Sequence, residues 1–480
     1  MPFDFTAVNS GATAWILASA ALVLLMTPGL AFFYGGMVRA KNVLGMLMQN
    51  LVVMALVSVL WMLIGYSLAF GGANGVLGGL HFAGLANLDE VVPGFTDEAA
   101  MSIPPVVYVA FQMMFAVITA ALITGATADR WKFGSCVIVI TLWTVVVYSP
   151  VAHWVFSPTG WLAGLGVLDW AGGTLVHVNA GAAALALSIV LGRRRGWPER
   201  AMPPHNLPFV VLGAALLWFG WFGFNAGSAL NANALSGYAF VNTNTAAAAA
   251  LLSWIAVEKL RYGKPTTLGA ASGVVSGLVA VTPCAGFIGP IGAAVVGMLA
   301  GALCAFAVAL KTWLRFDDSL DVAGVHLVAG MLGSLMVGLL ATTSVNSAGA
   351  DGLFYGGGYS LLGKQALAVL VVALYSFCAT MGIGVLVGRL IGNRVSPRAE
   401  QAGLDLTVHG EAAYEAGVLA NSNRPVAAVA RPATGTDAVP QRPQPRTPSP
   451  AWPRQAPPQA PDQPNRGSPW NPADFDGNRR

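Results

Sequence analysis

The sequence carries two matched stretches, DWAGGTLVH at residues 169–177 and DSLDVAGVH at residues 318–326. Each has an aspartate, seven further residues and then a histidine, and each leads into an apolar segment. An ionisable side chain inside a membrane segment is energetically costly and therefore indicates a functional site. Two such residues in matching contexts, one in each half of the chain, strengthen that indication.

Composition identifies the chain as a membrane protein. Only 10% of its 480 residues are charged, whereas soluble domains usually carry about 25% charged residues. Most of the sequence consists of apolar runs of about 20 residues, which is the length of a transmembrane helix. The pattern predicts an all-α polytopic protein embedded in a lipid bilayer, and we expect no nucleic-acid partner.

Eleven apolar spans are predicted, separated by short loops. They cover residues 13–36, 43–70, 104–127, 134–156, 169–191, 207–230, 239–257, 267–286, 288–310, 322–343 and 365–390. The boundary between the eighth and ninth spans is the least distinct, because only the stretch TPCAGFIGPIG separates them.

The charges of the loops predict the orientation of the chain. Basic residues follow the odd-numbered spans, as Arg39 follows the first and Arg130 the third. The loops on the other side carry acids such as Asp89 and Asp351, and Lys364 is their only base. Since short basic loops face the cytoplasm, we expect the N-terminus outside and the C-terminus in the cytoplasm, in a multi-pass protein of the plasma (inner) membrane.

The two matched stretches also predict an inverted repeat. Span five starts at the outer face, and eight residues of helix rise about 12 Å. This rise places His177 near the middle of a hydrocarbon core about 30 Å thick. Span ten starts at the inner face, and the same rise carries His326 to the middle from the opposite side. Spans one to five and six to ten therefore form a 5+5 inverted repeat with a site at its centre, and span eleven is an additional helix.

Other interpretations of these residues are compatible with the sequence. The two histidines could be unrelated buried residues, each of which forms a hydrogen bond with a neighbouring helix. A metal site needs one or two ligands besides two histidines, and no Cys, Asp or Glu is predicted at that depth, so we expect no metal and no other cofactor. Asp169 and Asp318 also fit the role of helix N-caps, in which a carboxylate accepts from free backbone N–H groups.

Aromatic residues gather in the outer halves of two predicted spans, where a path toward the histidines would begin. Phe111 and Phe115 lie one turn apart in span three, and span six contains WFGWFGFNAGS at residues 218–228. Aromatic faces beside a few oxygens suit a small cation, and an apolar neck below them would exclude hydrated ions. Below this neck, the imidazole groups of the two histidines can donate hydrogen bonds to a passing molecule or accept them from it. Ammonium, which can pass as neutral ammonia, fits this series of groups, as do water and a proton relay.

Four motifs together resemble those of a known family. They are PGLAFFYGGMVRAKN (28–42), DWAGGTLVHVNAG (169–181), FGWFGFNAGS (219–228) and DDSLDVAGVHLVAG (317–330). The resemblance is to the ammonium transporter/methylammonium permease/Rhesus family, in particular to its bacterial ammonium transporter branch. It covers residues 10–416, nearly the whole chain apart from the tail.

The resemblance implies roles for individual residues of the path. His177 and His326 match the paired pore histidines of the family. Phe115 and Phe224 match the two stacked phenylalanines of its hydrophobic gate, which closes the outer end of the pore. No catalytic residue is implied, and we expect a transport protein rather than an enzyme.

The resemblance also implies an outer ammonium-recruitment site. Ser228 matches its serine, Asp169 matches an aspartate that orders the vestibule, and Phe111 belongs to the same region. Phe156 occupies the position where the family usually has tryptophan, and a tryptophan lies on either side of it. Phenylalanine is a weaker cation–π partner than tryptophan, so either recruitment is weaker or one of these tryptophans substitutes.

Domain organisation and partners follow from the same resemblance. Residues 1–398 are expected to form the transmembrane domain of a homotrimer in which each subunit has its own pore. Residues 399–416 include GLDLTVHGEAAY, which is similar to the family's cytoplasmic regulatory C-terminal element, the part that supports regulation by PII signalling proteins. Residues 417–480 are rich in proline and are expected to be disordered.

The function implied by the resemblance is ammonium transport. The protein would recruit ammonium outside, remove a proton and pass ammonia along the two histidines. The alternative is an ammonium sensor of the same fold that signals through its cytoplasmic C-terminal region. A water or glycerol channel is disfavoured because paired Asn-Pro-Ala motifs are absent, and a retinal-type pump is disfavoured because no lysine lies within a predicted span.

Overall fold

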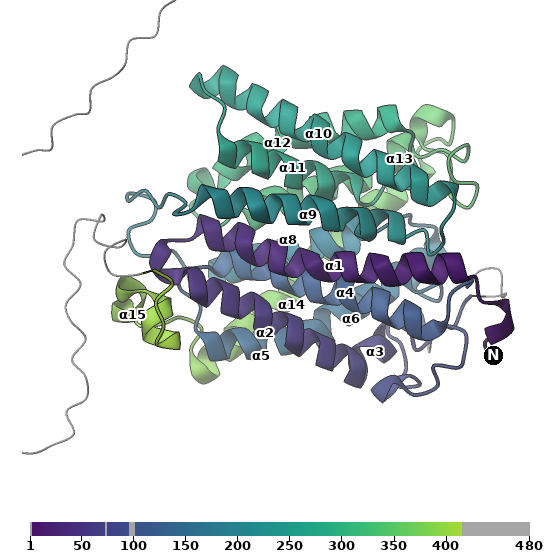
Figure 1. Ribbon diagram of the computed structural model, residues 1–480, viewed down its shortest axis with the longest axis horizontal. Coiled ribbons are helices and arrows are strands. Elements are labelled where there is room, and N and C mark those ends of the chain that lie inside the picture. Colours follow the sequence, from purple (N-terminus) through teal and green to yellow (C-terminus); the bar gives the residue numbers. More distant parts are fainter. Residues whose placement is uncertain (1, 73, 96–100, 415–480) are drawn as a thin grey trace, which may run out of the picture. The chain divides into compact units, whose positions relative to one another are not determined.

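The computed structural model describes residues 2–72, 74–95 and 101–414, which form a bundle of helices without a β-strand (Figure 1). Its α-helices are α1 (Ser10–Met37), α2 (Val43–Leu60), α3 (Tyr66–Phe70), α4 (Pro105–Ile123), α5 (Phe133–Trp143), α6 (Ser149–Phe156), α7 (Trp161–Leu165), α8 (Asn179–Leu191), α9 (Leu207–Gly227), α10 (Ala234–Tyr262), α11 (Thr267–Val281), α12 (Pro290–Leu314), α13 (Val328–Leu340), α14 (Ser360–Ile391) and α15 (Pro397–Ala402). The π-helical turns are η3 (Trp61–Gly65), η6 (Thr144–Tyr148), η7 (Gly173–Val178), η8 (Ala323–Leu327) and η10 (Asp405–His409). The 3-10 turns are η1 (Phe5–Ala7), η2 (Ala40–Asn42), η4 (Ala83–Leu85), η5 (Thr124–Thr127) and η9 (Leu353–Tyr355).

The predicted membrane spans correspond to these helices. In the described part of the chain, 10 helical segments are long and apolar enough to cross a bilayer, which confirms the all-α polytopic fold. Several of them join two helices through a π turn, as in the continuous segment Ala40–Phe70. The eighth predicted span differs, because α11 has only 15 residues and ends at Val281. The number eleven and the orientation in the membrane therefore stay predictions.

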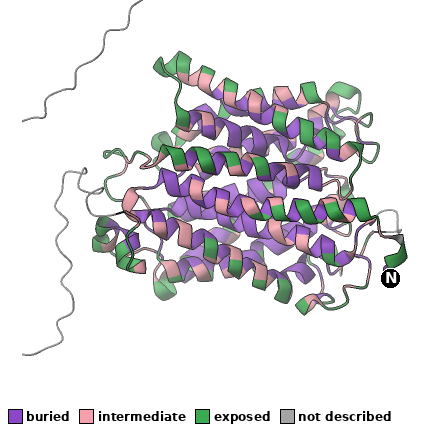
Figure 2. Ribbon diagram, viewed as in Figure 1, coloured by how far each residue is buried: buried purple, intermediate pink, exposed green. Residues whose placement is uncertain are grey.

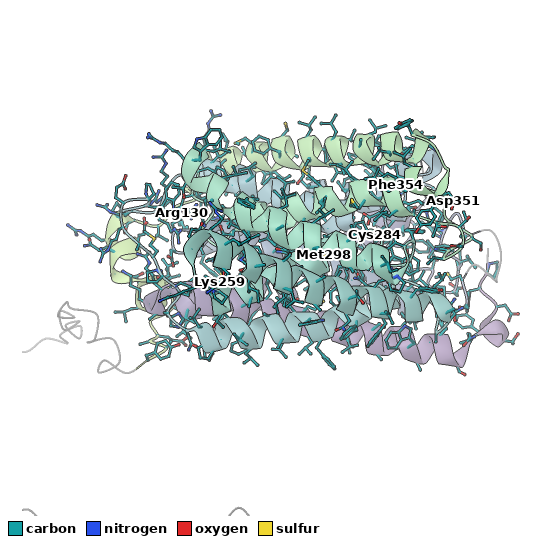
Figure 3. The ribbon with its side chains drawn as sticks, turned by 90° about the horizontal axis from the view of Figure 1, so that it is seen from above. Arg130, Lys259, Cys284, Met298, Asp351 and Phe354 are labelled. Carbon is teal, nitrogen blue, oxygen red and sulfur yellow. The ribbon has the colours of Figure 1, made fainter. Side chains whose placement is uncertain are left out.

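The two ends of the bundle carry different residues. Arg130 and Lys259 lie toward one end and Asp351 lies toward the other (Figure 3). The end with Arg130 also holds α15, whereas the N-terminus lies at the opposite end (Figure 1). This is the separation of basic and acidic loops that the sequence predicts.

The helices divide into a buried centre and an exposed rim (Figure 2). The segments that contain α4 and α8 are mostly buried, whereas α10 and α14 expose one side. Many exposed residues of the outer helices are large and apolar, among them Phe219, Leu252 and Leu370. Exposed apolar surface of this extent is typical of contact with lipid or with another subunit, as expected for a protein inside a membrane.

Two segments, called the half-helices below, cross in the centre of the bundle. One is η7 with α8 and the other is η8 with α13, and each contacts the π turn of the other. Gly181 and Gly330 each lie four residues after a histidine at this crossing. A Cβ on Gly181 would lie 2.5 Å from the backbone nitrogen of Leu327, and a Cβ on Gly330 would lie 3.0 Å from the Cβ atom of His177. Small residues allow membrane helices to approach this closely.

Gly181→Ala is therefore expected to destabilise the protein. The new methyl group would meet backbone atoms of the other half-helix, and overpacking of this kind destabilises by about 1–3 kcal/mol. The variant should lose its monodisperse size-exclusion peak at a lower temperature than the wild type. Gly382→Ala is the matched control, because a Cβ at Gly382 in α14 would have no atom outside its helix within 4 Å. Equal thermal midpoints for the two variants would contradict the tight crossing.

A buried cluster of charges joins four loops at the α15 end. Arg194 donates to Asp317 at 2.8 Å and lies 3.5 Å from Asp129, which also pairs with Arg39 at 3.0 Å. Arg130 donates to the backbone carbonyl of Asp317 at 2.6 Å. Burial alone would raise the pKa of Asp317, but the hydrogen bonds and charge of Arg194 hold that pKa below its usual value. Burial lowers the pKa of Arg130 to about 10. Both groups therefore stay charged at neutral pH and tie the loops together.

The predicted C-terminal element is attached to this cluster. The backbone N–H of Leu404 donates to the side chain of Asn42 at 2.8 Å, and Asn42 in turn donates to Asp129. The part of the element that the structure describes, residues 399–414, thus rests on the helical bundle. The last two residues of the predicted element and the predicted disordered tail, 417–480, lie outside the described residues.

Candidate functional site

The two histidines of the matched stretches meet where the half-helices cross. The Nδ1 atoms of His177 and His326 are 3.3 Å apart, and the ring centroids are 5.4 Å apart at an interplanar angle of 25°. Both residues are buried, with 1% and 4% of their surface exposed. Each belongs to a π turn, η7 or η8, and such interruptions of an α-helix are frequent at functional sites.

The contact between the two Nδ1 atoms restricts the hydrogens of the pair. One nitrogen must donate and the other must accept, so the two neutral rings take complementary tautomers. Two imidazolium rings would bring two N–H groups together, and the arrangement therefore needs at least one neutral ring. Within the described residues, no group of three His, Cys, Asp or Glu side chains could hold a metal ion.

His177 keeps one nitrogen free beside a small cavity. Among the described residues, its Nε2 atom is buried without a hydrogen-bond partner. The adjoining cavity has a volume of about 10 Å³, roughly the space that one water molecule needs. Apart from His177 and His326 its lining is apolar or aromatic: Met26, Leu30, Phe33, Ile118, Leu122, Val176, Leu217, Trp221, Phe224 and Val275. One small, neutral, hydrogen-bonding molecule fits this space.

The two phenylalanines predicted as a hydrophobic gate lie next to the histidines. The rings of Phe115 and Phe224 are 4.3 Å apart at 30°, and neither residue is exposed. The Phe224 ring lies 6.1 Å from the His177 ring. Trp221, one turn before Phe224 in α9, lies 5.4 Å from His177, because residues three apart share one face of a helix. The structure thus brings the phenylalanine pair and the histidine pair together.

Three of the residues predicted for outer recruitment lie around this gate. The ring of Phe111 is 4.9 Å from that of Phe115, and the ring of Phe156 is 6.3 Å from it. Ser228 follows Phe224 by one turn and donates to its carbonyl at 2.8 Å. The serine oxygen therefore keeps its capacity to accept a hydrogen bond.

The tryptophans on either side of Phe156 have other partners. Trp154 donates from Nε1 to the carbonyl of Val76 at 2.7 Å and packs on Tyr375 at a ring distance of 4.7 Å. Trp161 packs on Trp154 at 6.1 Å. Of these three aromatic residues, Phe156 is the one beside the gate.

Asp169 lies at the start of the half-helix that carries His177. Its two carboxylate oxygens accept from four backbone N–H groups: Gly172 (2.9 Å), Gly173 (2.6 Å), Thr174 (2.8 Å) and Leu175 (3.2 Å). The first N–H groups of a helix have no partner within the helix, and Asp169 supplies one. Gly172 adopts a left-handed conformation, φ 108°, which turns the chain so that these groups converge on the carboxylate.

Asp318 has the same local role in the second half-helix. Its carboxylate accepts from the backbone N–H groups of Val322 at 3.1 Å and Ala323 at 2.7 Å. The sequence suggests capping as a role for both aspartates, and the family resemblance implies a further role for Asp169 in ordering the outer recruitment site. The geometry makes both of them helix caps, and the cap at Asp169 has twice as many hydrogen bonds.

Trp221 is a site residue that the sequence analysis does not single out. Its ring stacks on His177 at 21°, and its Nε1 donates to Thr282 at 2.9 Å, so the indole is fixed in place. The available signal was its spacing of three residues from Phe224. Span six contains aromatic residues on every side, however, so spacing alone did not show which face is buried.

Comparisons with known proteins bear on the family of the chain. Residues 14–414 match the model of the Ammonium Transporter Family. The chain is 52% identical over 442 residues to an ammonium transporter of Mycobacterium tuberculosis, covering 87% of this chain and 93% of that protein. It is 48% identical over 409 residues to an ammonium transporter of Bacillus subtilis, covering 85% of this chain and 99% of that protein.

Solved structures show the same fold. The crystal structure of Mep2 from Saccharomyces cerevisiae superposes with a TM-score of 0.76 at 35% identity, covering 82% of this chain and 89% of that one. A structure described as a Sensor Amt Protein superposes with a TM-score of 0.75 at 30% identity, covering 82% of this chain and 97% of that one.

Proposed function

The chain belongs to the ammonium transporter family, and we propose from this premise that it conducts ammonia along the path past His177 and His326. It is a multi-pass protein of the plasma membrane. Two of its relatives, from Mycobacterium tuberculosis and Bacillus subtilis, are named ammonium transporters.

The observation that carries the proposal is the free Nε2 of His177. This buried nitrogen lacks a partner among the described residues and lies beside a cavity with space for about one small molecule. Ammonia donates and accepts hydrogen bonds and can therefore bind an imidazole nitrogen in either tautomer. The second imidazole, 3.3 Å away, offers the next partner along the path.

The apolar gate supports conduction of ammonia rather than of the ion. Ammonium would have to give up its hydration to pass Phe115 and Phe224, and burial of an unpaired ion costs several kcal/mol. Neutral ammonia avoids most of this cost. We infer that ammonium is gathered outside the gate by Phe111, Phe156 and Ser228, gives its proton to a water molecule there, and passes inward as ammonia. Asp169 acts by holding the half-helix and its histidine in place.

The same proposal includes assembly and regulation. We infer a homotrimer with one path per subunit, supported by large exposed apolar side chains such as Phe219 on α9. We also infer that a PII signalling protein binds at the α15 end, where residues 399–414 rest on the bundle and the loops are basic.

Proteoliposomes that contain the full chain test the proposed transport. An ammonium pulse should give a signal from a pH-sensitive dye enclosed in the liposomes, because each ammonia that enters the lumen takes up a proton there. Pulses of sodium or tetramethylammonium should give none, because a hydrated or bulky ion does not fit a cavity of about 10 Å³. Protein-free liposomes are the control for passive entry of ammonia. An ammonium signal equal to that control, or an equal signal for sodium, would overturn the proposal.

A further inference from the structure

A basic cleft lies at the α15 end of the bundle, outside the path described above. Its volume is about 190 Å³. Three segments far apart in the sequence line it: Arg39 and Lys41 after α1, Arg195, Gly196 and Arg200 after α8, and Glu400 and Gln401 in α15. Figure 1 shows α15 at the end of the bundle where α1 leads into α2. The cleft therefore joins the C-terminal element to two loops of the membrane domain.

The one acid in the lining is already engaged. Glu400 has a side chain that is only 2% exposed. One carboxylate oxygen accepts from Arg394 at 2.7 Å, and the other accepts from the backbone N–H of Arg195 at 2.7 Å. Glu400 therefore holds α15 in place and has little charge left to balance the cations of the cleft.

The four cations of the lining are incompletely paired. Within the described residues, the side chains of Arg195 and Arg200 have no hydrogen-bond or ion-pair partner. Arg39 pairs with Asp129 through Nε, but its buried Nη2 has no partner among those residues. Lys41 donates to a neutral backbone carbonyl of α15. The cleft thus presents several free N–H donors and a net positive charge.

We propose that this cleft binds a phosphate group, supplied either by free phosphate or by an anionic lipid headgroup. Like charges around one cavity repel one another, and a bound anion removes that repulsion. Guanidinium groups match phosphate oxygens in a bidentate geometry, and basic pockets of membrane proteins bind phospholipid headgroups. The volume suits a single phosphate group, since pockets for drug-sized ligands measure about 300–1,000 Å³.

A phosphate in this position would bridge the membrane domain and the C-terminal element. Arg39 and Lys41 would approach it from one loop and Arg200 from the other, while α15 closes the third side. Occupancy of the cleft would therefore strengthen the attachment of residues 397–414. This inference concerns a separate site and does not depend on which molecule passes the histidines.

Equilibrium dialysis with radiolabelled inorganic phosphate tests the site on the full chain in an uncharged detergent. The double variant Arg195→Gln/Arg200→Gln removes two cations without removing a side-chain partner, and size-exclusion chromatography checks that it folds. Lys264→Gln, which changes an exposed cation outside the cleft, is the matched control. We expect saturable binding to the wild type and the control, and binding at least about tenfold weaker to the double variant. If the double variant does not fold, Arg200→Gln alone should show a smaller loss.

Native mass spectrometry with short-chain phosphatidic acid separates the two sources of phosphate. A diacylglycerol of the same chain length is the neutral control. If the wild type retains phosphatidic acid, the double variant loses it and neither binds inorganic phosphate, the ligand is a lipid headgroup. If the wild type binds inorganic phosphate but does not retain phosphatidic acid, the ligand is free phosphate. Bound phosphate should also slow hydrogen exchange in residues 397–410. Equal binding by the wild type and the double variant, binding of neither probe, or unchanged exchange would overturn the proposal.

Discussion

Asp169→Ala should abolish transport and strongly destabilise the protein. The change removes the acceptor of four backbone N–H groups at the start of a buried half-helix. A buried polar group left without a partner costs about 1–3 kcal/mol, so we expect a loss of at least about 4 kcal/mol. The same N–H groups belong to the segment that positions His177, and the histidine pair should therefore lose its geometry as well.

Asp318→Ala is the matched control for this prediction. It removes the acceptor of only two backbone N–H groups in the equivalent half-helix, so its effect on stability should be smaller. The thermal midpoint in detergent and the uptake of methylammonium are measured on the same preparations. If Asp169 acted only by attracting the ion, its replacement would reduce uptake and leave the midpoint unchanged, and that result would contradict the capping role.

The sequence predicted that the two histidines meet, but it did not predict where their helices begin. The matched stretches 169–177 and 318–326 suggest eight residues of continuous helix, whereas η7 begins at Gly173 and η8 begins at Ala323. The start of each depends on a carboxylate that reaches several N–H groups at once and, in the first, on the left-handed Gly172. Apolar periodicity contains neither fact.

The end of the eighth span and the aromatic residue beside the histidines could not be predicted from the sequence either. The apolar run 267–286 continues past the end of α11 at Val281, because the turns that follow are buried and therefore apolar too. The carbonyl of Pro283 in these turns accepts from the backbone of Trp170 at 3.0 Å. In the same way, Trp221 was one aromatic residue among many in span six. Which of them faces a histidine is decided by helices distant in sequence.

His177→Ala is expected to reduce ammonium flux and to admit ions that the wild type excludes. The cavity beside His177 is otherwise apolar or aromatic, apart from His326, so ammonia would lose a hydrogen bond inside this cavity. A lost bond of about 1–3 kcal/mol corresponds to a flux lower by roughly 5- to 160-fold. The missing ring also leaves Nδ1 of His326 without its partner and enlarges a cavity of about 10 Å³, so water and hydrated cations gain space.

In one preparation of proteoliposomes, the pH of the lumen reports ammonium flux and currents on a solid-supported membrane report the entry of other cations. The response to ammonium should fall, and sodium or potassium pulses should give a signal that is absent in the wild type. His81→Ala is the control, because this histidine lies in the loop between α3 and α4 with 43% of its side chain exposed. The same reasoning applies to His326→Ala, since each ring is the partner of the other. Unchanged ammonium flux together with unchanged exclusion of sodium and potassium in both variants would contradict the assignment of the pair as the conducting site.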